Sequence, residues 1–460
     1  MRKKLIGIYH HLPPWSWSAV ASLQAWRLRR RRYGIAYTTA LPEIRERIGW
    51  NRERWLAFQR RQLAEQLDRA AGCVPAYRGN PIVGGRDPLE VLRTWPLVDV
   101  DRFRQSPGNY LDPQYGAGDC VTLYTSGSTG TPKKIVRDAR AEQLNYAYAE
   151  ARWRNTAGVN LDDRWVMIGG QLVVPVSRSR PPFWVRAYPM RQLYMSSYHL
   201  QEEFAEDYMR AILAWRPAYL LGYASSLKTL ADFSEKTGIR PPLKCILSNA
   251  EPLYAHVRLR LQRAFECDVR DTYGGTEGAF QGFECGAGRM HVSPDFGVLE
   301  IVDDEGRHCK AGEVGRAVVT GLTNRAMPLI RYPTGDLVAW AVDQRCGCGC
   351  SFPVLEHIEG RSDDVLVLPN GRRVGRLDPV FKATYPLREA QIAQRRDGSI
   401  EVRVVADLDG SGRCLWTLQH SRQLVLDLHA RLGSGGDIRI ALVDRIPRGK
   451  NGKFKAVVRE

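Results

Sequence analysis

Apolar residues spaced three and four positions apart mark amphipathic helices in two parts of the chain. Residues 52–70 carry one stripe made of Leu56, Leu63, Leu67 and Ala70. Residues 202–215 carry another made of Phe204, Tyr208, Ile212 and Trp215, and Pro217 ends that pattern. Because each stripe covers one side only, both predict helices that pack against a core.

From about residue 118 onward, short β-rich runs alternate with helical patterns. Runs at residues 121–124 and 165–168 lie on either side of a helical pattern near residues 141–153. This alternation predicts an α/β architecture in which helices cover sheets. Two later runs, residues 297–302 and 316–320, flank a turn-rich segment and predict an antiparallel subdomain.

The C-terminal part of the chain predicts a small α+β domain. It contains a β-rich run at 365–368 before the turn sequence Pro369-Asn370-Gly371, strands at 400–405 and 438–443, and a helix at 421–432. We therefore predict a large multi-sheet N-terminal domain, with α/β sheets and the antiparallel subdomain, followed by this small domain. The expected division is a helical segment over residues 1–110, a core over residues 111–360 and the C-terminal domain over residues 361–460.

Composition narrows the class of protein. The chain has 460 residues, 44% of them hydrophobic, which is enough for a large core. No apolar run reaches the roughly 18 residues of a membrane helix. The basic start is followed by His10, His11, Pro13 and Pro14, which interrupt the apolar core of a signal peptide. We therefore expect a cytoplasmic protein whose ten cysteines are thiols or metal ligands rather than disulfides.

Basic residues are concentrated near the N-terminus. The formal net charge is +17, and part of it lies at Arg27, Arg29, Arg30, Arg31 and Arg32. Such a run could attract nucleic acid, anionic lipid or an acidic carrier protein. No nucleic-acid motif accompanies it, so we expect no nucleic-acid partner and favour a solvated helix face. Nearby tryptophans leave peripheral membrane contact as a weaker alternative, and the oligomeric state, a homodimer included, stays open.

A run of small polar residues, Thr125-Ser126-Gly127-Ser128-Thr129-Gly130, follows the first β-rich run and precedes Lys133 and Lys134. Backbone N–H groups, hydroxyls and a lysine in such a turn suit a polyphosphate. We predict a strand, a flexible turn and then a helix. The spacing differs from a Walker P-loop, because the lysines follow Pro132 and precede Ile135. A plain surface linker is the alternative for this run taken alone.

Five further stretches follow this loop in a fixed order. They are Ser248-Asn249-Ala250-Glu251-Pro252, Asp271-Thr272-Tyr273-Gly274-Gly275-Thr276-Glu277, Arg331-Tyr332-Pro333-Thr334-Gly335-Asp336, Gly360-Arg361-Ser362-Asp363 and Pro447-Arg448-Gly449-Lys450-Asn451-Gly452-Lys453. The ordered set resembles the adenylate-forming superfamily of acyl-CoA ligases, luciferases and peptide-synthetase adenylation domains. Within it, the chain is most similar to the phenylacetate-CoA ligase family, particularly the branch named after capsular polysaccharide biosynthesis proteins.

The resemblance implies an ATP site with a role for each motif. The small-residue loop with Lys133 and Lys134 would hold the β- and γ-phosphates. Ala250 and Glu251 would lie against the adenine, and Tyr273 would stack on it next to Gly274. Thr276 would contact the α-phosphate, and the carboxylate of Glu277 would bind Mg²⁺, a hard cation that prefers oxygen ligands. Asp336 would accept hydrogen bonds from the ribose hydroxyls, and Arg361 would reach the ribose and phosphate.

The same resemblance implies that the small C-terminal domain is mobile. It would turn about a hinge at Asp363 and carry a lysine into the site for adenylation. Lys453 fits this role best, and Lys450 is the alternative. An ammonium group there would offset the negative charge that builds between the carboxylate and the α-phosphate.

Cysteine and histidine spacing predicts a structural Zn²⁺ site. Cys285 and His291 are followed by Cys346, Cys348 and Cys350, and three thiolates with one imidazole make a usual zinc set. Relatives often carry a Cys-x-Cys-Gly sequence here, and alignment on Pro353 implies that Cys346 and Cys348 are the ligands, with Cys350 as a substitute. A reduced cysteine-rich loop is the alternative.

We predict an ATP-dependent ligase. A carboxylate would attack the α-phosphate of Mg-ATP, release pyrophosphate and form an acyl-adenylate, and by family the acyl group would then pass to CoA. One alternative is an amide- or ester-forming synthetase that uses an amine, a hydroxyl or a carrier thiol. Another is a non-catalytic nucleotide-binding assembly factor, against which the intact Glu277, Asp336 and Lys453 count.

The carboxylic acid itself is not identified by the sequence. Its pocket is expected to come from the region between the small-residue loop and the Tyr273 motif. The expected lining residues are Trp184, Tyr188, Tyr194, Tyr198, His199, Tyr223 and Gly274. Arg178 and Arg180 would favour a polar or anionic group on this acid. These residues are equally consistent with ordinary core aromatics and surface arginines.

Overall fold

The structure, a computed structural model, describes residues 8–116, 118–125, 133–361, 366–367, 373–374, 385–432, 437–448 and 454–460. Twelve strands form one continuous sheet in the order β11-β12-β13-β14-β10-β9-β8-β7-β6-β3-β5-β4. They are β3 (Trp165–Gly169), β4 (Trp184–Ala187), β5 (Gln192–Ser196), β6 (Tyr219–Gly222), β7 (Cys245–Ser248), β8 (Asp268–Gly274), β9 (Gln281–Glu284), β10 (Met290–Val292), β11 (Gly297–Val302), β12 (Gly315–Gly321), β13 (Tyr332–Trp340) and β14 (Val354–Arg361).

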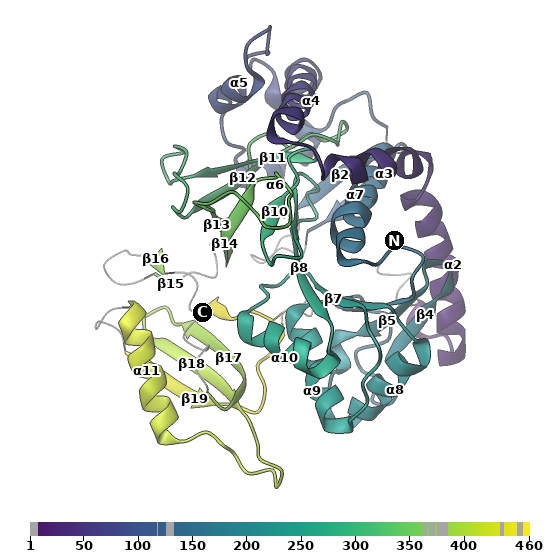
Figure 1. Ribbon diagram of the computed structural model, residues 1–460, viewed down its shortest axis with the longest axis vertical. Helices are drawn as coiled ribbons and strands as arrows, with labels where there is room; N and C mark the ends of the chain where they lie inside the picture. The colour runs from purple at the N-terminus through teal and green to yellow at the C-terminus, as the bar shows by residue number, and fades with distance from the viewer. Residues whose placement is uncertain are drawn as a thin grey trace.

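One half of this sheet is parallel. Strands β3, β5, β6, β7 and β8 run in the same direction, and β4 pairs antiparallel with β5 at the outer edge. The helices α8 (Ala205–Trp215), α9 (Ala224–Thr237) and α10 (Ala255–Phe265) lie along this half (Figure 1). Every residue of β6 and β7 is buried, as expected for strands that are covered on both faces. The α8 prediction is confirmed, because Tyr208, Ile212 and Trp215 are buried in its core.

Strand β8 joins the two halves of the sheet. Its residues 268–271 pair in parallel with β7, and residues 272–274 pair antiparallel with β9. Beyond it the strands are antiparallel, and β11 pairs with β12 from Gly297 opposite Gly321 to Val302 opposite Arg316. The predicted antiparallel subdomain is therefore confirmed as a continuation of the same sheet.

The N-terminal helices pack against both halves. They are α2 (Pro14–Arg32), α3 (Ile35–Arg47), α4 (Arg52–Cys73), α5 (Pro88–Thr94) and α6 (Val100–Gln105). The predicted stripe of α4 is confirmed at Leu63, Leu67 and Ala70, which are buried against the antiparallel half. In the described parts of the chain, every helix is too short or too polar to cross a membrane.

The element after the small-residue loop differs from the prediction. Strand β1 (Cys120–Tyr124) pairs antiparallel with β2 (Lys134–Asp138), so the loop connects two strands rather than a strand and a helix. The reason is that Ile135 and Val136 are buried in the core and favour a strand. The helix α7 (Ala139–Ala149) begins only after Asp138, whose carboxylate accepts a hydrogen bond from the Ala141 amide and caps it.

The C-terminal part forms the expected α+β unit. The described pieces are a hairpin of β15 (Leu366–Val367) and β16 (Arg373–Val374), a four-stranded sheet and the helix α11 (Leu418–Leu432). The sheet order is β19-β18-β17-β20, with bounds β17 (Leu387–Gln394), β18 (Ile400–Ala406), β19 (Ile438–Leu442) and β20 (Val457–Arg459). Figure 1 shows this unit, in yellow-green, beside α10 and below β14. The predicted turn at residues 369–371 lies outside the described residues.

Candidate functional site

The carboxyl ends of the parallel strands gather the predicted site residues along one edge of the sheet. Strand β5 is followed by Tyr198 and His199, β6 by Tyr223, and β7 by the turn with Ala250 and Glu251. Strand β8 ends at Gly274 within its nucleotide motif. Parallel strands bind ligands outside their carboxyl ends, so this edge is the natural place for a nucleotide and an acid.

Tyr273 and Asp336 come from two different motifs and meet at the β8 end of this edge. The Tyr273 hydroxyl donates a hydrogen bond to Asp336 Oδ2 at 3.0 Å. The Tyr273 ring packs edge-on against Phe280 with centroids 4.8 Å apart. Asp336 on β13 lies directly opposite Arg361 on β14 in the strand ladder. The aromatic ring and the carboxylate expected at the base and ribose are thus adjacent.

Lys133 and Glu277 join the loop motif to the β8 motif. Lys133 Nζ lies 3.5 Å from Glu277 Oε1, and both side chains are largely buried. The Lys133 amide donates to Thr125 Oγ1 at 3.1 Å, which closes the base of the loop. A Cβ at Gly275 would lie 2.4 Å from Glu277 Oε2, so glycine there leaves room for the carboxylate to fold back over the turn. Lys134 is exposed at the start of β2.

Arg137 supports this turn and was not among the predicted site residues. Its guanidinium donates to the Thr276 carbonyl at 2.5 Å and to Glu142 Oε2 at 3.2 Å. Gly278 has a φ of 62°, and a Cβ there would lie 2.6 Å from the same guanidinium. Thr276 itself is exposed at the edge. The sequence feature that could have identified Arg137 is its position as a charged residue within β2, a largely buried strand.

Glu251 has contacts that differ from those the resemblance implies. Its carboxylate accepts hydrogen bonds from the Ser225 amide at 2.9 Å and from the Phe454 amide at 2.7 Å. It therefore binds the start of α9 and the C-terminal segment together. Burial raises the pKa of the Glu251 carboxyl group, and these backbone donors act in the opposite direction. The preceding Ala250 is exposed and has a φ of 63°.

Several predicted site residues lie outside the described residues. They are Ser126, Gly127, Ser128, Thr129, Gly130, the hinge residue Asp363, Lys450 and Lys453. Arg361 is described as a strand residue only. Phe454, the residue after Lys453 in the sequence, is described, and its amide donates a hydrogen bond to Glu251 Oε1 at 2.7 Å.

Most of the predicted acid-pocket residues lie at the same edge. The Tyr198 hydroxyl donates to the Gly170 carbonyl at 3.0 Å, after the end of β3. His199 is buried, with Nδ1 2.8 Å from Ser196 Oγ and its ring stacked on Phe183 at 4.6 Å. Burial lowers the pKa of His199, which favours the neutral imidazole. Tyr223 lies between the carboxyl end of β6 and the start of α9.

Two predicted pocket aromatics and one arginine have other contacts, and one of them, Tyr188, lies away from this edge. Tyr188 follows the antiparallel β4, so it lies at the opposite edge of the sheet, where it is 58% exposed and packs on Trp215. Trp184 is half-buried and packs edge-on against Tyr208 of α8 at 5.5 Å, against the core of the parallel half. Arg178 donates to the Pro181 and Pro182 carbonyls of its own loop.

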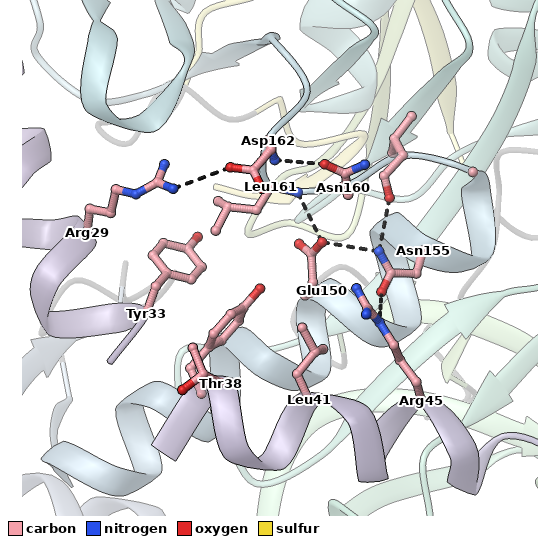
Figure 2. Close-up of a pocket in the computed structure, with 13 residues that line it drawn as sticks. Arg29, Tyr33, Thr38, Leu41, Arg45, Glu150, Asn155, Asn160, Leu161 and Asp162 are labelled. Carbon is pink, nitrogen blue, oxygen red and sulfur yellow. Dashed lines mark hydrogen bonds and ion pairs between the residues drawn. The ribbon is translucent and has the colours of Figure 1, made fainter. Parts of the chain in front are cut away.

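A cavity of about 710 Å³ lies at that opposite edge (Figure 2). Its wall comes from α2, α3 and the segment that precedes β3, with Tyr33, Arg45 and Glu150 among the lining residues. Glu150 is buried and accepts hydrogen bonds from the Leu161 amide and from Asn155. This cavity is separate from the edge where the nucleotide motifs converge.

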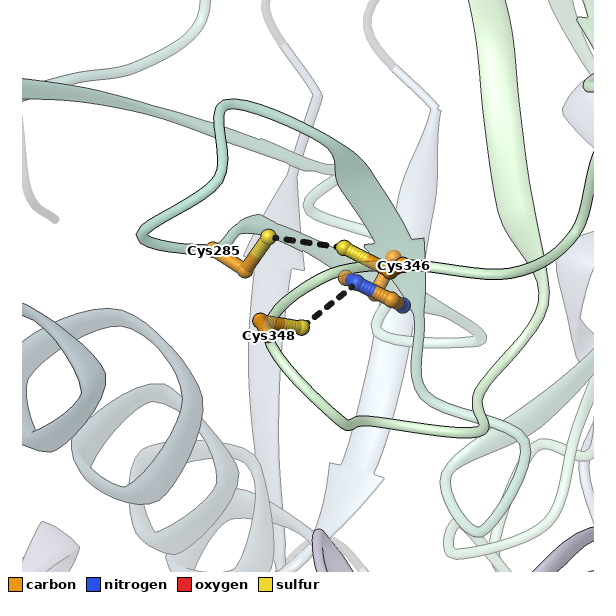
Figure 3. A group of neighbouring side chains, drawn as sticks. Cys285, Cys346 and Cys348 are labelled. Carbon is orange, nitrogen blue, oxygen red and sulfur yellow. Dashed lines mark hydrogen bonds between the residues drawn. The ribbon is translucent and has the colours of Figure 1, made fainter.

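Cys285, His291, Cys346 and Cys348 form one compact cluster (Figure 3). Their ligand atoms all lie within 4.8 Å of one another, with Cys285 Sγ 3.5 Å from Cys346 Sγ and Cys348 Sγ 3.4 Å from His291 Nε2. A tetrahedral Zn²⁺ with Zn–S bonds near 2.3 Å separates its ligands by roughly 3.8 Å, so the four atoms fit this ion. His291 Nδ1 lies 3.0 Å from the Phe352 carbonyl, which orients Nε2 toward the thiols.

Cys350, expected as a substitute ligand, is not part of this cluster. Its side chain is buried among Trp55, Phe283 and Phe352. Its backbone amide donates to Cys348 Sγ at 3.5 Å. Cys350 therefore contributes packing and a backbone hydrogen bond to the sulfur beside it.

Comparison with known proteins identifies the family. The chain matches the AMP-binding enzyme family over residues 82–325 and the CapK C-terminal domain over residues 366–460. It is 26% identical to Protein CapK of Staphylococcus aureus over 390 residues, 82% of each chain. It is 29% identical to a phenylacetate-coenzyme A ligase of Pseudomonas putida over 334 residues, 67% of this chain and 71% of the relative.

A solved structure of 2-hydroxyisobutyryl-CoA ligase, in complex with R3-HIB-AMP in the postadenylation state, has a similar fold. The TM-score is 0.70 at 20% sequence identity, covering 89% of this chain and 90% of the other. The chain belongs to the AMP-binding enzyme family and is an adenylate-forming ligase. The resemblance inferred from the motifs and the predicted fold class are confirmed.

Proposed function

We propose that this ligase activates a carboxylic acid with ATP as an acyl-adenylate and transfers the acyl group to CoA. The observation that carries the proposal is the 3.0 Å hydrogen bond between Tyr273 and Asp336, 63 residues apart in the chain. It joins a ring that can stack on a base to a carboxylate that can bind ribose hydroxyls. Both lie at the carboxyl edge of the parallel strands, beside Lys133 and Glu277.

Each motif then has one task in the first half-reaction. The loop between Thr125 and Lys133 holds the β- and γ-phosphates, which leave as pyrophosphate. Thr276 contacts the α-phosphate, and Lys453 offsets the negative charge that builds there as the carboxylate attacks. Glu277 offers carboxylate oxygens next to the loop, which suits Mg²⁺, and that ion when bound supplies further charge neutralisation on the phosphates.

The second half-reaction is proposed from the relatives. Phenylacetate-coenzyme A ligases and 2-hydroxyisobutyryl-CoA ligase are named for CoA as the acceptor. We propose the domain division at residues 110 and 360 and a rotation of residues 361–460 about Asp363 between the half-reactions. Ten free cysteines agree with a reducing compartment such as the cytoplasm.

A screen for pyrophosphate release tests this function. Aryl, fatty, hydroxy and amino acids are each supplied with Mg-ATP, with CoA or simple amines as acceptors, and products are identified by mass. We expect one class of acid to release pyrophosphate and to yield an acyl-CoA. Lys453→Ala should abolish this release, whereas Lys310→Ala, an exposed lysine on a distant turn, should not. An amide or ester product without acyl-CoA would assign the acceptor differently.

We also propose that the cluster of Cys285, His291, Cys346 and Cys348 holds a structural Zn²⁺. Four protein ligands leave no open position, which is the arrangement of a structural rather than a catalytic site. The cluster fastens the turn between β9 and β10 to the loop before β14. Strand β9 follows the Tyr273 to Glu277 motif and pairs with β8, which carries Tyr273. The ion would therefore stabilise the strand next to the proposed nucleotide site.

A further inference from the structure

Helix α2 lies along the outer edge of the molecule, next to the edge strand β4 (Figure 1). One side of the helix packs against the rest of the protein. Trp17 and Ala25 are buried, Ser22 Oγ donates to the Arg186 carbonyl at 3.2 Å, and Arg29 donates to the Pro189 carbonyl at 2.7 Å. The orientation of α2 is therefore set, and its other side faces outward.

The outward side carries large apolar residues. Trp15 is 83% exposed, Leu23 54%, Trp26 47% and Val20 37%. All twelve tryptophans of the chain are described, and Trp15 and Trp26 are the two that are exposed. Exposure of tryptophan and leucine side chains to water is unfavourable. Two exposed tryptophans on one surface helix therefore indicate a binding site for an apolar partner.

The same side is basic. Residues 14–32 contain no aspartate or glutamate, and Arg27 and Arg30 are exposed between the apolar residues. The Arg30 guanidinium lies over the Trp26 ring, 4.8 Å from its centroid. Neighbouring Arg31 is engaged by the buried Glu142 at 3.4 Å, so Arg27 and Arg30 provide the outward charge.

We propose that this face of α2 docks the protein on the surface of an anionic lipid bilayer. Tryptophan rings are suited to the interface between headgroups and acyl chains, and arginine side chains pair with anionic headgroups. Nucleic acid would use the arginines but would leave Trp15, Val20 and Leu23 exposed to water, and an acidic protein would do the same unless it offered an apolar groove.

The docking face continues toward the edge where, in the proposed function, the acid binds. His10 Nε2, just before α2, lies 2.9 Å from the Leu172 carbonyl in the loop after the carboxyl end of β3. Leu172 and Val176 in that loop are 41% and 56% exposed. A bilayer in contact with α2 would therefore lie close to the mouth of the acid site, which suits an acid that partitions into lipid.

Vesicle sedimentation with the full chain tests the proposal. We expect binding to vesicles of phosphatidylcholine with about one third phosphatidylglycerol, and weak binding to phosphatidylcholine alone. Each arginine near an anionic surface contributes about 1 kcal/mol, so Arg27→Gln with Arg30→Gln should reduce partitioning roughly 30-fold. The matched control is Arg52→Gln with Arg61→Gln, which removes the same charge from exposed positions on α4 and should bind as the wild type does.

A second pair of variants tests the apolar part. Trp15→Ala with Trp26→Ala should reduce binding and remove quenching of tryptophan fluorescence by brominated lipids, with an unchanged melting temperature because both side chains are exposed. Equal binding to neutral and anionic vesicles, or equal loss in the α4 control, would overturn the proposal. Retention of single-stranded RNA without vesicle binding would assign the face to nucleic acid instead.

Discussion

The carboxylate of Glu251 accepts a hydrogen bond from the backbone amide of Phe454 at 2.7 Å, across 203 residues of sequence. Phe454 directly follows Lys453 in the chain. Glu251 also binds the Ser225 amide at the start of α9, so one side chain holds the C-terminal segment against the nucleotide edge. We propose that Glu251, by holding Phe454, acts as a positioning residue for the lysine before it.

We predict that Glu251→Ala lowers kcat for pyrophosphate release roughly ten- to hundredfold, because hydrogen bonds to a carboxylate contribute about 1.5–3 kcal/mol. The KM for ATP should change little, and transfer from a supplied acyl-adenylate to CoA should be retained. Glu203→Ala, at an exposed position, is the control. If KM rose at constant kcat, Glu251 would act on the adenine, as the resemblance implies.

Asp336→Asn should weaken ATP binding if Asp336 binds the ribose as we propose, because an amide NH₂ group replaces one accepting carboxylate oxygen. We expect an increase of roughly tenfold in the KM for ATP. Tyr273→Phe removes only the hydroxyl that orients Asp336 and should cost about 1 kcal/mol, close to fivefold. Steady-state kinetics with Asp207→Asn as an exposed control measures both, and an unchanged KM in both variants would remove Asp336 from the ribose site.

The cysteine cluster predicts one equivalent of zinc per chain, measurable by elemental analysis of the purified protein. Cys348→Ser should lose the metal and lower the melting temperature, since structural zinc contributes directly to folding free energy. Cys414→Ser changes another exposed cysteine outside the cluster and should do neither. Less than about a tenth of an equivalent in the wild type would end the zinc proposal.

Asp271 predicts a pH dependence of stability. Burial, and then the neighbouring Glu284 carboxylate, raise the pKa of Asp271 to about 7. The folded protein therefore keeps a proton that the unfolded chain loses near pH 4, so this group's contribution to the free energy of unfolding falls between pH 4 and pH 7.

Asp271→Asn should reduce the fall in the free energy of unfolding with pH by up to a few kcal/mol. Denaturant unfolding at pH 5 and pH 8 measures this change. For each protein, the free energy of unfolding at pH 8 is subtracted from that at pH 5. The difference for the wild type is then compared with the difference for the variant. Histidines that titrate in the same range contribute equally to both differences, so the comparison isolates Asp271. A wild type whose stability changes with pH as the variant does would show that Asp271 is ionised in the folded protein.

Local pattern was sufficient for much of the fold. The stripe of Leu63, Leu67 and Ala70 predicted α4, and the apolar runs predicted β3 and β11, because burial on one face leaves a periodic signal. The residues after the loop were assigned wrongly because Ile135 and Val136 form too short an apolar run to distinguish strand from helix. Only their pairing with β1 decides it.

Motif order predicted which residues would converge, and the structure brings Tyr273 to Asp336 and Lys133 to Glu277. The same reasoning could not place Tyr188, because the reversal of β4 relative to β5 is set by sheet pairing and carries it to the wrong edge. It also missed Arg137 and the bond from Phe454 to Glu251. Each bond has a backbone group as one partner, so no pairing of residue types along the sequence indicates it.

We propose that an acyl-adenylate forms reversibly at the edge where Tyr273, Asp336 and Glu277 lie, with Lys453 as the catalytic lysine. The most direct measurement is exchange of labelled pyrophosphate into ATP in the absence of CoA or any other acceptor, for each acid that releases pyrophosphate. We expect exchange that depends on the acid and is lost in Lys453→Ala. Pyrophosphate release without exchange, or exchange that is independent of the acid, would contradict it.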